Sequence, residues 1–408
     1  MEGVDRVKEQ RQNKGELLLK GPGRSKLMAC ARSFEGLSRS FYYLPDRKPE
    51  ECRAKDFSFD RMATRSDIIW HNRLSENRLM VADQLLEVSK IIEDMADEIG
   101  RIGEVSAKKE ERIRKVLKRE GLTAEDILAV QNKDGRLEIY MNVKADWGNR
   151  IASKEAAEYL SSALKVRMTP SLHAKSMIDA EFVSICFEEE PSFHVLTGYA
   201  KSIKDRETES GDSFSFARTG RGHMLMSLSD GMGSGPAAAY ESRTSIELLE
   251  QFVEAGFSTD AAASMINGAM IGRSEERIIT TLDVCRFDLY DGFLSYLKAG
   301  ASSTFIRHKD GVEIITSENL PLGIFHELDF DKGTKKLYDE DIVVMVTDGV
   351  LDRLGGNAPE KRFARVLMQT ECRNPKEIAG RLLKYVMLSS DGPCRDDMTV
   401  LVTGIWRN

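Results

Sequence analysis

The sequence predicts an α/β protein of the α+β type, an antiparallel β-sandwich flanked by helices, preceded by a small α/β regulatory domain and a long helix. Short apolar runs joined by the hairpin signals Asp291-Gly292 and Asp310-Gly311 predict the sandwich. A strictly alternating run over residues 137–144 predicts a half-buried strand of the small domain. An apolar repeat with alternating spacings of four and three residues predicts the helix.

The length and composition are those of a soluble protein of two or three domains. The 408 residues include 31% charged and 41% hydrophobic residues, and the formal net charge of −7 gives no general attraction to nucleic acid. The six cysteines form no CxxC pair, which argues against a disulfide framework and a zinc ribbon. No apolar run reaches the ~20 residues of a transmembrane helix. We therefore expect a cytoplasmic protein that reaches a membrane only through a partner.

The pattern of apolar residues divides the chain into four parts. Residues 1–70 show weak periodicity and are expected to form a weakly structured tail. A long regulatory helix is expected over 71–118 and a small α/β domain over 119–205. The small domain contains no acidic cluster and no glycine loop, so we expect it to regulate or connect. Residues 206–408 contain the motifs that carry chemistry.

The expected long helix has a heptad seam. Its apolar positions are Val81, Leu85, Val88, Ile92, Met95, Ile99 and Ile102. An exposed seam of this length would favour aggregation, so another surface must cover it. Either the helix packs on its own domain, or residues 81–102 join two chains in a homodimer.

The remaining elements follow from short apolar runs and from helical periodicity. In the small domain we expect a helix at 153–165 and strands at 181–187 and 193–200. In the sandwich we expect strands at 212–217, 224–229, 280–289, 292–299, 303–308, 311–315, 342–347 and 399–405, with helices at 236–255, 259–271 and 375–388.

Acidic residues stand at the ends of three of these apolar runs. Asp230-Gly231 follows one run, Asp348-Gly349 follows another, and Asp396-Asp397 precedes a third. A single Asp-Gly is more often a turn, but none of these three is needed for a tight hairpin. Converging carboxylates favour Mg²⁺ or Mn²⁺, because a cation offsets their mutual repulsion. The sequence therefore predicts a metal-dependent hydrolase.

Four motifs in this order give the chain a family resemblance. The segments 229–235, 319–324, 347–350 and 396–400 resemble those of the metal-dependent type 2C (PPM) protein phosphatases, and within them the serine phosphatases of the stage II sporulation protein E branch. The match also takes in Gly211-Asp212-Ser213 and the helix at 77–98, so that it covers about residues 75–408. The resemblance implies a type 2C phosphatase-like fold.

The resemblance also implies a site that holds two ions, Mn²⁺ or Mg²⁺. Asp230 would bridge both ions, the carbonyl of Gly231 would complete one site, and Asp348 with Asp396 would complete the other. Asp212 matches an acid that holds metal-bound water. Many relatives have Asn where this chain has Asp397, so we favour Asp396 over Asp397 as the ligand. Asp230, Asp348 and Asp396 are thus the expected catalytic residues.

Other properties of the family lead to further expectations. The substrate would be a phosphorylated anti-sigma factor antagonist, whose dephosphorylation activates a sporulation sigma factor. The helices at 236–271 would transmit control from the preceding helix to the Asp230 loop. Many relatives hold the phosphate with an arginine; Arg218 and Arg221 are merely the nearest candidates here. The family usually carries a multi-span membrane module ahead of the helix, and this chain shows none.

Two alternatives compete with catalysis. The glycines of 231–235, ahead of a helix, would suit a nucleotide-sensing binding module, but no lysine follows them and this reading leaves Asp348 and Asp396 unexplained. The second alternative is a protein that keeps the phosphatase fold and binds a partner without catalysing a reaction. The retention of all three acidic positions argues against this alternative.

Overall fold

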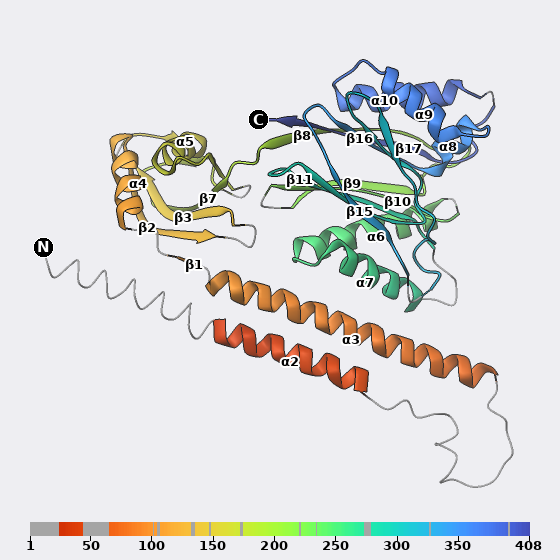
Figure 1. Cartoon of the computed structure of the whole chain (residues 1–408), viewed down its shortest axis with the longest axis horizontal. Helices are drawn as coiled ribbons and strands as arrows, with labels where there is room; N and C mark the ends of the chain where they lie inside the picture. Colours follow the sequence, from red (N-terminus) through yellow and green to blue (C-terminus); the bar gives the residue numbers. More distant parts are fainter. Residues whose placement is uncertain are drawn as a thin grey trace, which may run out of the picture. The chain divides into compact units, whose positions relative to one another are not determined.

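The computed structural model describes residues 24–43, 65–100, 102–103, 107–131, 135–146, 148–171, 174–219, 222–233, 235–272, 279–325, 328–390 and 392–408. The chain divides into two compact units. The first contains residues 1–45 and 81–190, and the second contains residues 46–80 and 191–408. Figure 1 shows their helices and strands.

The second unit is built on two five-stranded antiparallel sheets. One has the strand order β15-β12-β11-β10-β9, with β9 Asp212–Thr219, β10 His223–Asp230, β11 Leu282–Asp288, β12 Phe293–Ala299 and β15 Asp331–Lys336. The other has the order β14-β13-β16-β17-β8, with β8 Phe193–Ser202, β13 Thr304–Arg307, β14 Val312–Ile315, β16 Ile342–Val346 and β17 Met398–Arg407.

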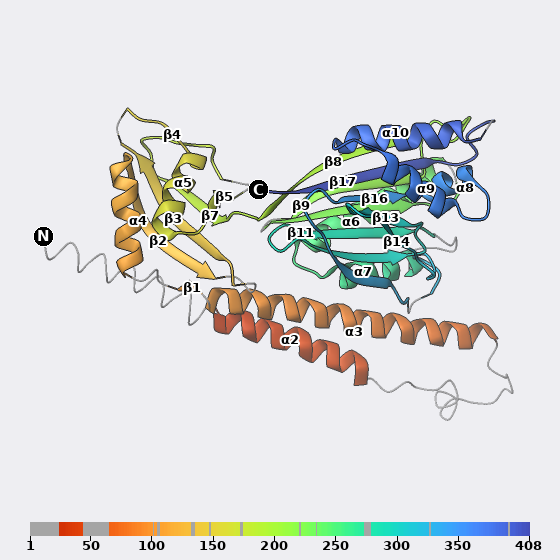
Figure 2. The ribbon, with the colours of Figure 1, turned by 45° about the horizontal axis from the view of Figure 1, so that its top comes forward.

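The two sheets pack face to face, and helices cover their outer faces (Figure 2). Met226 and Phe287 of one sheet share a buried core with Val343 and Leu401 of the other. The outer face of the first sheet is covered by α6 Pro236–Glu254 and α7 Thr259–Gly272, and that of the second by α8 Asp348–Leu354, α9 Pro359–Gln369 and α10 Pro375–Leu388. The predicted sandwich flanked by helices is confirmed.

The central strands are apolar because both of their faces are covered. Every residue of β16 is buried, and six of the eight residues of β10 are buried. Strands covered on both faces read as continuous apolar runs rather than as alternating ones. The first acidic residue after each run therefore marks the place where the strand leaves the core, at Asp230 and at Asp348.

Most strands and helices expected in the sandwich are present, but β15, α8 and α9 were not predicted. Strand β15 is a polar edge strand of sequence DKGTKK, so it carries no apolar alternation. Helix α8 begins at Asp348, in a motif that reads as a turn, and has only seven residues. The pattern of α9 was present in its buried Phe363 and Leu367 but was missed.

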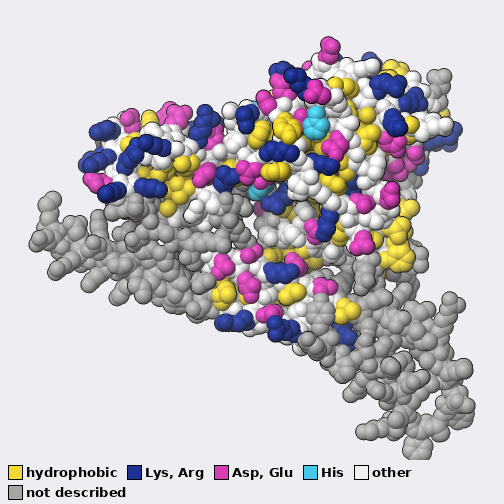
Figure 3. Space-filling view, viewed as in Figure 1, with side chains coloured by type: hydrophobic (Ala, Val, Ile, Leu, Met, Phe, Trp, Pro, Cys, Tyr) yellow, Lys and Arg dark blue, Asp and Glu magenta, His cyan; other side chains and the backbone are white. Residues whose placement is uncertain are grey.

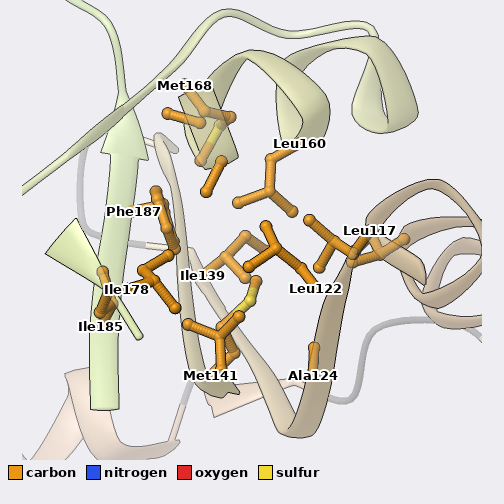
Figure 4. Close-up of a cluster of buried hydrophobic side chains, with 14 of the residues drawn as sticks. Leu117, Leu122, Ala124, Ile139, Met141, Leu160, Met168, Ile178, Ile185 and Phe187 are labelled. Atoms are coloured by element: carbon orange, nitrogen blue, oxygen red, sulfur yellow. The ribbon is translucent and has the colours of Figure 1, made fainter. Parts of the chain in front are cut away.

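The small domain of the first unit is a five-stranded sheet with two helices on one face. The sheet has the order β1-β2-β3-β7-β5, with β1 Ile102–Gly103, β2 Leu122–Gln131, β3 Leu137–Ala145, β5 Met168–Pro170 and β7 Val183–Glu189; β4 Ile151–Ala152 and β6 Met177–Ile178 form a separate pair. Helices α4 Ala107–Arg119 and α5 Ser153–Leu164 cover the sheet. Figure 4 shows Leu117 and Leu160 of these helices directed toward Ile139.

Two expected boundaries are wrong. The strand predicted at 193–200 belongs to the sandwich as β8, where it pairs with β17 over its full length. The helix predicted at 71–118 is two helices, because α3 Arg65–Gly100 ends at a glycine and α4 joins the small domain. Glycine favours helix ends, since it adopts conformations closed to other residues at little cost.

Part of the tail predicted at 1–70 is helical. Helix α2 spans Arg24–Tyr43 and packs on α3. The Ser38 hydroxyl donates to the Ala82 carbonyl at 2.6 Å, and the Ser89 hydroxyl donates to the Ala31 carbonyl at 2.9 Å. These pairs show that the two helices are antiparallel. The rest of the predicted tail, 1–23 and 44–64, lies outside the described residues.

The face of α3 that is most deeply buried consists of small residues. Ala82, Ser89 and Ala96 are at most 2% exposed and recur every seven residues. Each of them directly follows a residue of the predicted seam in the sequence. The seam residues from Val81 to Met95 are less buried, and Met95 is 51% exposed. Small side chains let two helix backbones approach closely but leave little hydrophobic signal in the sequence. Self-pairing through 81–102 stays a prediction.

The α2–α3 contact should be sensitive to side-chain size at Ser89. Ser89→Leu is expected to force the helices apart and to raise amide hydrogen exchange throughout α2, because a buried backbone contact cannot absorb the added volume. Met95→Leu is the matched control on the exposed side of α3. Unchanged exchange in α2 for Ser89→Leu would show that the two helices do not hold this contact in solution.

The surface mixes charges of both signs, and α4 presents a group of basic side chains (Figure 3). Glu110 and Glu111 pair with Arg114 and Lys115 one turn along this helix, so part of the charge is compensated locally. No helix in the described part of the chain carries an apolar run long enough to cross a membrane.

Candidate functional site

Asp212 and Asp230 lie side by side, where β9 begins and β10 ends. They are register partners, and the alternation of the two strands directs both side chains between the sheets. Asp212 is 2% exposed, and one of its oxygens accepts from the hydroxyl of Thr399 at 2.5 Å and from that of Thr347 at 3.2 Å. Its other oxygen has no hydrogen-bond partner in the described structure. Asp212 thus links the two sheets and directs an unsatisfied oxygen at the site.

The Asp230 main chain is held by the start of the neighbouring strand. Its N–H donates to the Thr281 hydroxyl at 2.9 Å. Its carbonyl accepts from the Thr281 N–H at 2.9 Å and from the Thr280 hydroxyl at 2.8 Å. The predicted motif at 319–324 supports this arrangement, because Leu322 and Thr280 exchange backbone hydrogen bonds. The carboxylate of Asp230 therefore rests on a fixed backbone.

Gly231 lies against the first turns of α6. A Cβ atom at this position would stand 2.4 Å from the Ala238 carbonyl oxygen, a distance that no side chain tolerates. The family resemblance gives this glycine a role through its carbonyl, which would complete one ion site. The structure adds a packing reason, which is that only glycine lets the Asp230 loop approach α6 this closely.

Asp348 and Asp396 come together through a second close backbone contact. Asp348 is the first residue of α8, and Asp396 lies just ahead of β17. A Cβ atom on Gly349 would stand 2.2 Å from the Asp397 carbonyl oxygen and 3.2 Å from the Asp396 Cβ. Glycine at this position lets the two acidic segments touch.

The predicted acids act on one another electrostatically. Burial, together with the charges of Asp212, Asp348 and Asp396, raises the pKa of Asp230 to about 9. Burial and the charge of Asp396 also raise the pKa of Asp348. Carboxyl groups this close must share protons or a cation, since their ionised forms repel one another at short range.

The carboxylate and carbonyl oxygens of these residues are the kind of ligand that divalent cations such as Mg²⁺ and Mn²⁺ prefer. In the described part of the chain no three His, Cys, Asp or Glu side chains already stand as a metal-binding group. The acids instead repel one another, because the charges of Asp212, Asp348 and Asp396 all act on Asp230. A cation would offset this repulsion, and the unsatisfied oxygen of Asp212 offers an acceptor.

The two neighbouring acids at 396 and 397 have different surroundings. The carboxylate of Asp397 is buried and accepts from the N–H groups of Lys204 at 2.9 Å and Gly211 at 2.8 Å. Asp396 is exposed, and its charge acts on Asp230 and Asp348. This arrangement favours Asp396 as the metal ligand and gives Asp397 the structural task of holding two loop amides.

The arginine considered for phosphate is remote from the acids. Arg218 pairs with Met224 near the far end of β9, six residues or roughly 20 Å from Asp212 at the usual rise of a strand. Arg221 lies outside the described residues. Lys201 of β8 is a cation that lies close to Asp212 and was not predicted from the sequence; its ammonium donates to the Asp212 carbonyl at 2.7 Å. Nothing in the sequence around Lys201 marks it.

Without divalent cations, the stability of the protein should fall as the pH rises. The pKa of Asp230 is raised in the folded state, so over this range the folded chain holds a proton that the unfolded chain has lost. The contribution of Asp230 to the free energy of unfolding is fully present below the pKa that Asp230 has in the unfolded chain. This contribution is lost as the pH rises toward 9, the pKa of Asp230 in the folded chain. Urea midpoints measured in a chelator from about pH 6 to about pH 8.5 should therefore decrease, and Asp230→Asn should flatten the trend. A parent midpoint that rises with pH would contradict the clustering of these acids.

Two family models match most of the chain. The model for stage II sporulation protein E (SpoIIE) matches residues 220–405, and the model for its regulatory domain matches residues 54–188. Among curated proteins, the chain is 31% identical to stage II sporulation protein E of Bacillus subtilis (strain 168) over 339 residues, and 30% identical to that of Priestia megaterium over the same length. These matches cover 82% of this chain but only 41% and 58% of the relatives.

A solved structure extends the match to the fold. The PP2C phosphatase domain of SpoIIE from Bacillus subtilis, with a fragment of its regulatory domain, is 28% identical to this chain with a TM-score of 0.58. The match covers 85% of this chain and 100% of that one. With both family models matched in order and the fold shared, the chain belongs to the stage II sporulation protein E family.

Proposed function

We propose that this chain is a metal-dependent protein serine phosphatase that uses two Mn²⁺ or Mg²⁺ ions. The observation that carries the proposal is the close backbone contact at Gly349, which brings Asp348 near Asp396, and the raised pKa of Asp230 supports the convergence of all three acids. Membership of a family with a solved PP2C phosphatase domain supports it. A binding module would not need buried carboxyl groups that repel one another.

Each acidic residue has a distinct part in this proposal. When bound, the two ions would activate water near neutral pH and offset charge on the phosphate oxygens. Asp230 would lie between the ions and the Gly231 carbonyl would complete one of the sites. Asp348 and Asp396 would complete the other. Asp212, fixed by the hydroxyls of Thr347 and Thr399, would orient water beside the ions.

Lys201 and Asp397 would act without touching the phosphate. Lys201 donates to the main chain of Asp212 and brings a positive charge near Asp212, Asp230 and Asp397. Asp397 fixes the N–H groups of Lys204 and Gly211 on the segment that leads into Asp212. Both residues therefore keep the acidic ends of the two sheets in register.

The substrate proposed is a phosphorylated anti-sigma factor antagonist, so that dephosphorylation would activate a sporulation sigma factor. The similarity to two stage II sporulation protein E sequences supports this choice. Control would reach the site through α6, because Ala238 of this helix touches Gly231. A shift of α6 would displace the Gly231 carbonyl and weaken one ion site. Pairing of two chains through 81–102 would be one source of such a shift.

The proposal is tested by phosphate release from a phosphoserine-containing anti-sigma factor antagonist. Release should require Mn²⁺ or Mg²⁺, stop when a chelator is added, and resume when the ion is supplied in excess. The same assay on the dephosphorylated protein is the control for contaminating phosphate. If Mn²⁺ binds and no phosphate is released, the chain is a binding module built on a phosphatase fold.

A further inference from the structure

Three polar side chains form a closed group inside the apolar core between the two sheets. Lys298 of β12 donates to the Asp283 carboxylate of β11 and to the Thr304 hydroxyl of β13 at 2.8 Å. The Thr304 hydroxyl in turn donates to the same carboxylate oxygen, Oδ2, at 2.8 Å. The Lys298 side chain is fully buried and that of Asp283 is 2% exposed. A buried ion pair of this kind adds little stability compared with apolar residues of the same size.

This group lies one step along the sheet from the acidic site. Asp283 is the register partner of Leu228, two residues before Asp230 on the same face of β10. A cavity of about 20 Å³ is lined by residues of both the buried polar group and the acidic site. The residues that line it include Asp230, Asp283, Asp348 and Ala301. The cavity therefore joins the buried ion pair to two of the proposed metal ligands.

One oxygen of the Asp283 carboxylate lacks a hydrogen-bond partner. Oδ2 takes both hydrogen bonds of the group, and Oδ1 is buried with no hydrogen-bond partner in the described structure. A buried oxygen in this position needs a donor, and a cavity of this size holds one water molecule. Because Lys298 already balances the charge of Asp283, the cavity favours a neutral donor over a further cation.

We infer that one ordered water in this cavity links Asp283 to one of the two neighbouring carboxylates, Asp230 or Asp348, and that Asp283 and Lys298 are positioning residues for these ligands. The inference rests on the proposed function. Residues that orient metal ligands from behind typically change metal affinity by ~10- to 100-fold when they are replaced. Here the water would donate one hydrogen to Asp283 and the other to a carboxylate, which fixes the direction of that carboxylate's remaining lone pairs.

The first test replaces the whole polar group with apolar residues of similar volume. The triple variant Asp283→Val, Lys298→Met, Thr304→Val leaves no buried charge unpaired, so its urea midpoint should stay near that of the parent. Its Kd for Mn²⁺, measured by calorimetry, should rise by about 10-fold or more. The matched control is Thr403→Val, which removes a buried hydroxyl between the same sheets away from the cavity and should leave the Kd unchanged.

The second test leaves the ion pair intact and fills the cavity. Ala301→Val places two methyl groups in the space assigned to the water, and it should weaken Mn²⁺ binding by a similar factor while Asp283 and Lys298 remain paired. A parent-like Kd in Ala301→Val, or in a folded triple variant, would overturn the inference. Failure of the parent itself to bind Mn²⁺ would instead overturn the proposed function, so the two outcomes are distinct. A high-resolution crystal structure should show the water within hydrogen-bond distance of Asp283 Oδ1, and an empty cavity would also overturn the inference.

Discussion

Asp230→Asn and Asp348→Asn should each lower phosphate release by on the order of 100-fold or more, because each removes a charged ligand and displaces the ions that position water and phosphate. The same variants should unfold at higher urea concentration than the parent in the absence of divalent cations. That gain follows from the raised pKa values of both groups, since replacing one carboxyl group relieves desolvation and repulsion in the cluster. A loss of function with a gain in stability would separate a metal ligand from a residue that maintains the fold.

The matched control for these substitutions is Asp310→Asn. Asp310 and Gly311 form the same dipeptide at an exposed hairpin between β13 and β14, where the Asp serves the turn. Its replacement should change neither phosphate release nor the effect of Mn²⁺. Activity within a few-fold of the parent in either Asp230→Asn or Asp348→Asn would show that these carboxyl groups do not hold the ions.

Much of the sandwich and the identity of its acids could be predicted because their signals are local. An apolar strand followed by Asp-Gly is visible within ten residues, as at Asp230 and Asp348, and the strands before these residues are largely buried because helices cover both sheets. The same reasoning failed at β15, whose polar sequence is that of an edge strand. It also failed at α2, whose contact with α3 is made by Ala31 and Ser38 rather than by large apolar side chains.

The supporting residues of the site could not be predicted because they come from distant parts of the chain. Asp212 receives its hydrogen bonds from Thr347 and Thr399, which lie 135 and 187 residues away in the sequence. Threonine in a strand is ordinary, and only the packing of one sheet on the other gives these hydroxyls a carboxylate to bond. The sequence around Lys298 likewise predicts the polar end of a strand. In the folded protein its side chain is buried beside Asp283.

Gly231→Ala and Gly349→Ala should each lower phosphate release by on the order of 100-fold, although neither glycine contributes a side chain. At Gly231 the added methyl group would meet the Ala238 carbonyl oxygen at 2.4 Å, and at Gly349 it would meet the Asp397 carbonyl oxygen at 2.2 Å. Both obstacles are main-chain atoms, so the loop rather than a side chain must move. The first substitution would draw the Gly231 carbonyl away from one proposed ion site, and the second would separate Asp348 from Asp396 at the other.

Calorimetric titration with Mn²⁺ can tell the two substitutions apart. Gly231→Ala should raise the Kd of one of two Mn²⁺ binding steps, and Gly349→Ala should raise the Kd of the other. Each substitution should leave the Kd of the remaining step unchanged. Gly380→Ala in α10 is the control, because an added Cβ there meets no atom within 4 Å and alanine is favoured over glycine in a helix by about 1 kcal/mol. It should retain both binding steps and unfold at slightly higher urea concentration. If Gly231→Ala and Gly349→Ala weaken the same step, then the Gly231 carbonyl and the Asp348–Asp396 pair serve one ion, and the division of ligands between two sites proposed above is wrong.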